Sequence, residues 1–197
     1  MKRIWLSCLI LLLLAVPAWG DTHTYTDALA DHDASAAGNW DIGVPADGDT
    51  IDIANEMGIN PTTPISGGGG GDGATFHFLL TTGNGLGIDL EAFIDRTGGT
   101  PDAIGNVQLS GVAPDVGCTG PIGGTVILDA DSGSIFSPIG GITIAGKITI
   151  GASCFLSPTG VVVANGGMDF AGLMYIDAEG DGVDSASPIN CTGDCEI

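Results

Sequence analysis

Ser137-Pro138-Ile139-Gly140 recurs twenty residues later as Ser157-Pro158-Thr159-Gly160, and this repetition decides the fold expected for the 197-residue chain. Glycines at positions 120 and 180 continue the same spacing on either side. When residues 117–136, 137–156 and 157–176 are laid beneath one another, four apolar columns line up. The columns are Ile122, Ile142 and Val162; Leu128, Ile148 and Met168; Ala130, Ile150 and Phe170; and Phe136, Leu156 and Ile176.

Apolar and polar residues alternate within a unit, as in Ile142-Thr143-Ile144 and Ile148-Thr149-Ile150. A period of two predicts β-strands. Strands this short cannot bury a core alone, so successive units are expected to hydrogen-bond to one another around a shared interior. We predict an all-β, single-domain parallel β-helix, or β-solenoid, with rungs of about 20 residues. An antiparallel β-sandwich is the alternative, because its strands are also short and separated by turns.

Further strand candidates precede the repeat with looser spacing, at residues 51–53, 76–80 and 107–109. The glycine run at 67–71 lacks the lysine and hydroxyl residue of a phosphate-binding loop, so it reads as a solvated excursion. We place the solenoid at 48–176, between an N-terminal polar capping segment at 21–47 and an acidic, cysteine-containing cap at 177–197.

The first twenty residues have the features of a secretory signal peptide. Lys2 and Arg3 precede an apolar run over 4–16, and the small residues Ala18 and Gly20 suit signal peptidase. We predict a signal peptide at 1–20 and a mature chain that is secreted and lies outside the cell or at its surface. No later run reaches the roughly 18 apolar residues of a membrane span, so none is expected in the mature chain.

The chain is strongly acidic, with 24 Asp and Glu against 4 Lys and Arg and a formal net charge of −20. Such a charge repels phosphate backbones and anionic membranes, so we exclude nucleic acid as a partner. Divalent cations are the natural counter-ions. Because 44% of the residues are hydrophobic, a packed core is expected in spite of the charge.

Residues 38–53 contain Asn39-Trp40, then Val44-Pro45 and Gly48-Asp49, and end in the alternating run 51–53. This segment resembles the entry segment of bacterial secreted and surface β-helix proteins of the autotransporter-passenger-like and adhesin-like kinds. The resemblance implies that Trp40 covers the open end of the apolar stack. Such a cover protects both the core and a free strand edge.

Acidic residues alternate in Asp177-Ala178-Glu179-Gly180-Asp181-Gly182-Val183-Asp184. The segment resembles the calcium loops of thrombospondin type 3 repeats. That resemblance implies Ca²⁺ as a cofactor, held by Asp177, Glu179, Asp181, the Val183 carbonyl oxygen and Asp184. It departs from the pattern where Pro188 stands in place of the closing glutamate, and a solvated acidic turn is the alternative.

Four cysteines follow the leader, and export permits disulfides with three possible pairings. They are Cys118, Cys154, Cys191 and Cys195. The short separation of Cys191 and Cys195 favours a staple at the C-terminal end, with free thiols as the alternative.

No catalytic constellation stands out, and we expect no enzyme. After the leader the basic residues are Arg96 and Lys147, too few for a lyase that must hold an acidic sugar. Carboxylate pairs such as Asp129 with Asp131 are expected by chance among 24 acids. His77 alternates with phenylalanines in a predicted strand and is expected to face solvent.

These properties favour a structural or adhesive β-solenoid of the cell surface or extracellular matrix, stabilised by calcium if the acidic loop binds it. Surface or matrix proteins, glycans and further copies of the chain are the candidate partners. The alternative is a carbohydrate-binding or polysaccharide-degrading β-helix protein.

Overall fold

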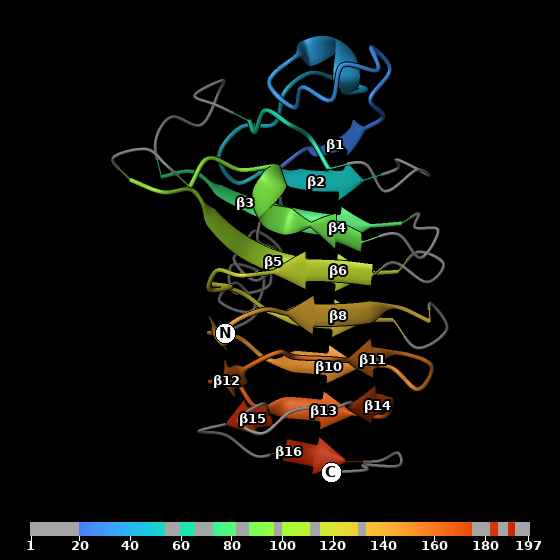
Figure 1. Cartoon of the computed structure of the whole chain (residues 1–197), viewed down its shortest axis with the longest axis vertical. Helices are drawn as coiled ribbons and strands as arrows, with labels where there is room; N and C mark the ends of the chain where they lie inside the picture. The colour runs from blue at the N-terminus through green and yellow to red at the C-terminus, as the bar shows by residue number, and fades with distance from the viewer. Residues whose placement is uncertain are drawn as a thin grey trace, which may run out of the picture.

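The computed structural model describes residues 20–53, 60–65, 73–81, 87–96, 100–110, 115–129, 133–174, 182–184 and 189–191. Within these ranges the chain is built of β-strands and two three-residue 3-10 helices, η1 (Ala37–Asn39) and η2 (Leu90–Ala92). The strands lie above one another along the longest axis of the molecule (Figure 1). The predicted signal peptide falls on residues 1–19, outside the described ranges, and on Gly20.

The strands form three sheets. The eight-stranded sheet contains, in order, β1 (Thr22–Tyr25), β2 (Thr50–Ile53), β3 (Thr75–Leu80), β5 (Ala103–Leu109), β7 (Val126–Leu128), β10 (Ile148–Ile150), β13 (Met168–Phe170) and β16 (Ile189–Cys191). The five-stranded sheet contains β4 (Gly87–Asp89), β6 (Asp115–Cys118), β8 (Ile135–Pro138), β11 (Phe155–Leu156) and β14 (Leu173–Met174). The three-stranded sheet contains β9 (Ile142–Ile144), β12 (Val161–Ala164) and β15 (Gly182–Asp184).

Each pairing between strands of these sheets is parallel, among the described residues. The predicted all-β class with parallel sheets is therefore confirmed, and the antiparallel sandwich is wrong. The strands expected at 51–53, 76–80, 107–109, 142–144 and 148–150 are all present. The eight-stranded sheet also includes β1 and β16, which lie outside the range 48–176.

Paired residues in the eight-stranded sheet are separated by one pass of the chain, defined as the stretch from one strand of this sheet to the next. The first three passes are long: His23 pairs with Ile51, Ile51 with Phe78, and Phe78 with Val107. Later passes are close to the predicted twenty residues, and Ile148 pairs with Met168. Inward residues such as Ile148 and Leu156 are fully buried, so consecutive passes share one apolar core.

Each of the four predicted apolar columns is confirmed for one pair, and three of them need correction at their third residue; Ala130, the third residue of the remaining column, lies outside the described residues. Ile148 pairs with Met168, and Ile150 with Phe170. Ile142 pairs with Val162, and Phe136 with Leu156. However, Ile122 lies beside Ile144 instead of Ile142, and Leu128 pairs with Ile150 instead of Ile148. Met174, and not Ile176, follows Leu156.

These errors share one physical cause. The number of residues between two corresponding positions differs from one pass to the next. Cys118 and Ile122 are four positions apart, whereas their partners Pro138 and Ile144 are six apart. The two additional residues allow β9 to form, so the three-stranded sheet begins there. A two-residue slip keeps every side chain on the same face of a strand, and for this reason the inward residues were identified correctly although their partners were not.

A column of glycines marks one corner of successive passes. Gly124 donates its backbone N–H to the carbonyl oxygen of Gly105 at 3.0 Å, Gly146 donates to Gly124 at 2.9 Å, and Gly166 donates to Gly146 at 3.0 Å. A Cβ atom at Gly146 would lie 2.5 Å from the carbonyl oxygen of Gly124. The corner is therefore glycine because the backbones of neighbouring passes touch there.

Acidic and amide side chains hydrogen-bond one pass to the next. The Asp47 carboxylate accepts from the backbone N–H of Thr75 at 2.8 Å, and Glu91 accepts from that of Thr119 at 2.8 Å. The Asn106 side chain accepts from the backbone N–H of Thr125 at 2.9 Å. Acids thus satisfy backbone N–H groups at the ends of strands and in the turns beside them.

Trp40 lies at the N-terminal end of the stack, as expected. Its backbone bridges antiparallel to Tyr25 on the outer edge of β1, and its ring packs edge-on against the Tyr25 ring with centroids 5.1 Å apart. The indole N–H donates to the carbonyl oxygen of Ala34 at 2.8 Å, and the side chain is 5% exposed. Both the core and the free edge of β1 are covered by this segment.

His77 is half-buried, so the expectation of a solvent-facing ring needs correction. The pairing of β3 with β5 shifts between Phe76 and Phe78, where β5 contains an additional residue. The Nδ1 atom of His77 accepts from the backbone N–H of Asn106 at 2.9 Å, at the position of this bulge. Burial lowers the pKa of His77 below its ordinary value.

We predict that Gly146→Ala destabilises the protein by about 1–3 kcal/mol, because the new methyl group overlaps the carbonyl of Gly124. Gly117→Ala is the matched control, since its Cβ would meet no atom closer than 3.7 Å. Urea unfolding monitored by circular dichroism measures both. Equal stability of the two variants would contradict the close approach at the corner.

We predict that His77 makes the stability of the protein fall on acidification. A neutral ring must accept the Asn106 N–H, and the pKa is depressed in the folded state. The contribution is therefore complete above the ordinary value of 6.5 and is lost as the pH falls through the lower folded-state pKa. His77→Gln keeps an acceptor without titrating, so the difference in unfolding free energy between wild type and variant should depend on pH below 6.5. A constant difference would remove this assignment.

Candidate functional site

The outward face of β4, β6 and β8 brings two aspartates and two glycines together. Gly87 pairs with Asp115, and Asp89 pairs with Gly117, which in turn pairs with Ser137. Each aspartate therefore has a glycine as its neighbour on the adjoining strand. The diagonal arrangement leaves the two carboxylates on either side of a floor that carries no side chains.

A groove of about 270 Å³ lies over this floor. It is lined by Asn60, Gly87, Ile88, Asp89, Asp115, Gly117, Ser137 and Ile139. The lining combines carboxylate, amide and hydroxyl groups with the side chain of Ile139, which is 50% exposed. Such a mixture suits a ligand that has both hydroxyl groups and apolar C–H surface.

The position of Asp89 is fixed by its neighbours. Its side chain accepts from the backbone N–H of Glu91 at 3.1 Å and caps η2, and its own backbone N–H donates to Asn60 Oδ1 at 2.9 Å. Burial raises the pKa of Asp89, with a contribution from the neighbouring Glu91. On the next strand the Ser137 hydroxyl donates to Asp115 Oδ1 at 3.2 Å.

Gly87 and Gly117 differ from the corner glycines, because their backbones do not require glycine. A Cβ at Gly117 would meet the Ile88 carbonyl oxygen at 3.7 Å and Ile139 Cδ1 at 3.9 Å, which are ordinary contacts. A Cβ at Gly87 would meet no atom of the described residues within 4 Å. Neither residue has a positive φ angle. Both positions could therefore hold a side chain, but that side chain would occupy the groove.

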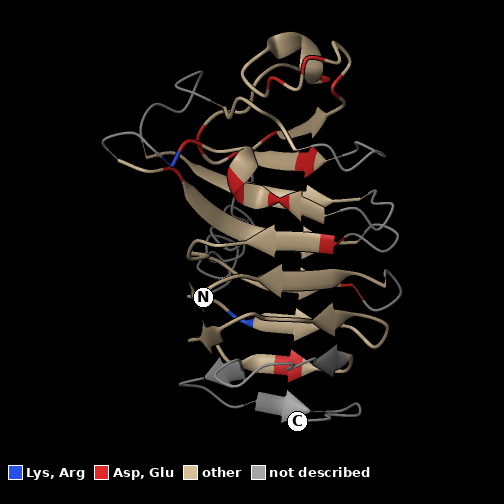
Figure 2. Ribbon diagram, in the orientation of Figure 1, with Lys and Arg blue, Asp and Glu red and all other residues tan. Residues whose placement is uncertain are grey.

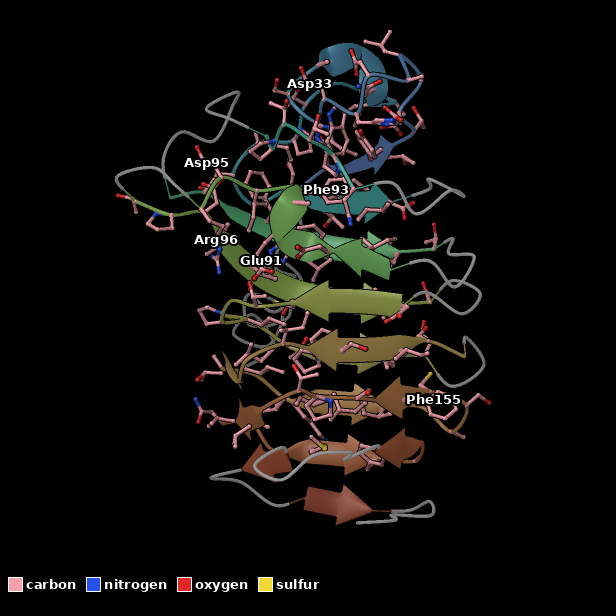
Figure 3. All side chains as sticks on the ribbon, viewed as in Figure 1. Asp33, Glu91, Phe93, Asp95, Arg96 and Phe155 are labelled. Carbon is pink, nitrogen blue, oxygen red and sulfur yellow. The ribbon has the colours of Figure 1, made fainter. Side chains whose placement is uncertain are left out.

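The same sheet continues below the groove with apolar residues. Ile135 pairs with Phe155, whose side chain is 37% exposed on the outer side of β11 (Figure 3). Val161, on β12 of the three-stranded sheet, is 44% exposed. The outward surface thus changes from acidic beside β4 and β6 to apolar beside β11.

The two basic residues of the described chain, Arg96 and Lys147, lie elsewhere (Figure 2). Arg96 donates to the backbone carbonyl of Asp102 at 2.6 Å, and its other terminal nitrogen lies 3.7 Å from Glu91 Oε1. Lys147 forms an ion pair with Asp169. Figure 3 shows Arg96 beside Glu91. Neither basic side chain lines the groove.

Burial disfavours ionisation of Glu91, yet the backbone N–H groups of Thr119 and Gly120 hydrogen-bond its carboxylate, and its pKa is lowered. The neighbouring Cys118 is buried, and burial raises the pKa of its thiol to about 12. Such a thiol is a poor nucleophile. The Glu91–Arg96–Cys118 cluster therefore reads as structural.

Most of the predicted calcium site lies outside the described residues, since Asp177, Glu179 and Asp181 fall there. Val183 and Asp184 belong to β15, where they pair with Val162 and Val163. Within the described ranges no three His, Cys, Asp or Glu side chains gather in a way that could hold a metal ion. The calcium loop stays a prediction.

The other sequence candidates are spread over the molecule. Cys118 and Cys154 are buried thiols and are not joined to each other. Cys195 and Asp131 lie outside the described residues, so the Cys191–Cys195 staple and the Asp129–Asp131 pair stay untested. His23 and His32 contact Asp49 and Asp27 at 3.0 and 2.6 Å in the N-terminal segment.

Sequence reasoning missed the groove, although a signal for it exists. Gly87-Ile88-Asp89 and Asp115-Val116-Gly117 are mirror-like tripeptides 28 residues apart. A twenty-residue period does not align these two tripeptides.

Comparison of the chain with family models, with curated proteins and with solved structures finds no match. No helix in the described part of the chain is long and apolar enough to cross a membrane.

Proposed function

We propose that the protein is a secreted structural or adhesive component of the cell surface or extracellular matrix, built as a β-solenoid. The observation that carries this proposal is the addition of one parallel strand to the same sheet with each pass of the chain. Growth of this kind lengthens the molecule without widening it and yields a rigid rod. A rod suits the display of a surface at a distance from its anchor.

The distribution of acids supports a structural role. Asp47, Asp52 and Asp102 each accept a backbone N–H from a residue 28 or 29 positions away in the chain, in an adjacent pass. Their charge is used to hold passes together. The Asp102 carboxylate is buried and accepts from both Ala74 and Asp95.

The proposal that the protein is exported rests on the predicted signal peptide. The acidic surface is compatible with a protein that lies outside the cell. In Figure 2 acidic residues lie in loops and in strands along the stack. A surface of one sign keeps such rods apart from one another and from anionic membranes. Attachment then depends on specific contacts with a partner.

An antibody raised against residues 21–197 should label intact cells of the organism that encodes the chain. Deleting the gene should remove the label and reduce attachment to a surface or cohesion between cells. Labelling that appears after permeabilisation alone would contradict the proposal. If intact cells are labelled but deletion of the gene leaves attachment and cohesion unchanged, the protein lies at the cell surface but has no adhesive role.

Calcium is proposed as a stabiliser of the C-terminal segment through Asp177, Glu179, Asp181, Val183 and Asp184. These residues offer the oxygen ligands that the ion prefers. Chelation by EDTA should lower the melting temperature, and Asp181→Asn should abolish that response. Asp21→Asn is the control because it removes the same charge from the opposite end of the chain. An EDTA response that survives in Asp181→Asn would place the ion elsewhere.

Carbohydrate binding is a second candidate function, and the groove on β4, β6 and β8 favours it. Its acids, amide and hydroxyl are polar groups of the kind that orient a sugar ring, and Ile139 offers an apolar surface. We propose no catalysis.

A further inference from the structure

We propose that the groove over Gly87 and Gly117 is a binding site for a neutral glycan, recognised through its hydroxyl groups by Asp89 and Asp115. The inference rests on the proposed adhesive role and names the chemical class of its partner.

Gly87 and Gly117 leave space above the sheet that a side chain would otherwise fill. Glycine in a strand weakens it, and the usual reasons are a bulge, a tight bend or the close approach of another group. The pairing of β4 with β6 is in register, and neither glycine has a positive φ angle. No neighbouring atom of the described protein would obstruct a Cβ at either position. Among the described residues no other group needs this space, and the occupant that we infer is a ligand.

The hydrogen-bonding capacity of Asp89 and Asp115 determines which groups a ligand must offer. Ionised carboxylates accept hydrogen bonds and donate none. A ligand for Asp89 and Asp115 must therefore supply donors, which adjacent sugar hydroxyls do. The two aspartates stand on neighbouring strands on either side of the glycine floor, so they can hold one chain from two sides.

The negative charge of the groove disfavours an anionic ligand. Its lining contains two aspartates and no Lys or Arg, and both basic residues of the described chain are held by acids elsewhere. Uronate or sulfated glycans would bring negative charge next to Asp89 and Asp115. A neutral glycan avoids this repulsion, and its C–H face can contact the exposed Ile139.

A peptide fits the groove less well. Extended peptides commonly bind by adding a strand to a free sheet edge. Strand β4 is the edge strand of this sheet, and its Asp89 N–H is already bonded to Asn60 Oδ1. In the floor of the groove, β6 is bonded to β4 and β8, and β8 is bonded to β6 and β11. Their backbone groups are therefore used, and recognition falls to side chains.

The size of the groove limits how tightly it is expected to bind a glycan. Its volume of about 270 Å³ lies just below the range of about 300–1,000 Å³ that is typical of ligand pockets. It accommodates a short part of a glycan, so single contacts should be weak. Repeated contacts along a polymer would then give adhesion.

The test uses the secreted form of the full chain and isothermal titration with neutral gluco-, manno- and xylo-oligosaccharides, an oligogalacturonate and a lysine-rich peptide. At least one neutral oligosaccharide should bind, with little effect of salt. Gly117→Leu, which fills the floor, should weaken binding by about tenfold or more, and Asp115→Asn should weaken it as well.

Matched controls separate the site from general effects. Gly123→Leu places the same side chain at an exposed turn glycine outside the groove, where a Cβ would meet Ile104 O at 3.4 Å. Asp21→Asn removes one charge outside the groove. Both variants should bind like wild type, and thermal melts should show all four variants folded.

Absence of binding to every neutral oligosaccharide would overturn the proposal. So would tighter binding of the oligogalacturonate or the peptide, or equal binding by Gly117→Leu and Gly123→Leu. Surface labelling distinguishes this failure from that of the proposed function. If the protein binds neutral glycans at the groove but is absent from the cell surface, the glycan site is supported and the proposed adhesive role is contradicted.

Discussion

The fold depends on parallel hydrogen bonding between residues one pass apart in the chain. In a parallel ladder each strand must return to the same direction, so the chain has to travel around the core before it pairs again. Here that circuit takes between 19 residues, from Val107 to Val126, and 29 residues, from Phe78 to Val107. The circuit can vary in length because the ladder constrains the strands and leaves the connections free.

Two residue types adapt to this constraint in opposite ways. Glycine allows backbones to touch at the corner formed by Gly124, Gly146 and Gly166. Acids reach across the wider gaps, as Glu91 does to Thr119. The composition rich in glycine and acids thus has a structural origin in turns. Against this background Gly87 and Gly117 are exceptions, since neither backbone contact nor φ explains them.

The sequence allowed the fold class to be predicted because alternation in strands survives small shifts of register. Ile142, Ile148 and Ile150 were placed correctly in the interior, although the partners of Ile122 and Leu128 were misassigned by two residues. The groove could not be predicted from a fixed period, because its strands β4 and β6 belong to a pass of 28 residues. His77 was also misjudged, since its partner Asn106 lies in a bulge that alternation does not reveal.

Deletion of one pass tests the stacking most directly. Removing residues 147–166 joins Gly146 to Gly167, and Gly166 hydrogen-bonds to Gly146 as its counterpart in the next pass. Strand β13 should then pair with β7, and β14 with β8, so the shortened protein should keep its β-sheet circular dichroism and melt cooperatively. Deleting residues 147–156 alone removes half a pass and should prevent folding. If the longer deletion unfolds the protein as completely as the shorter one does, equivalent passes do not hold it together.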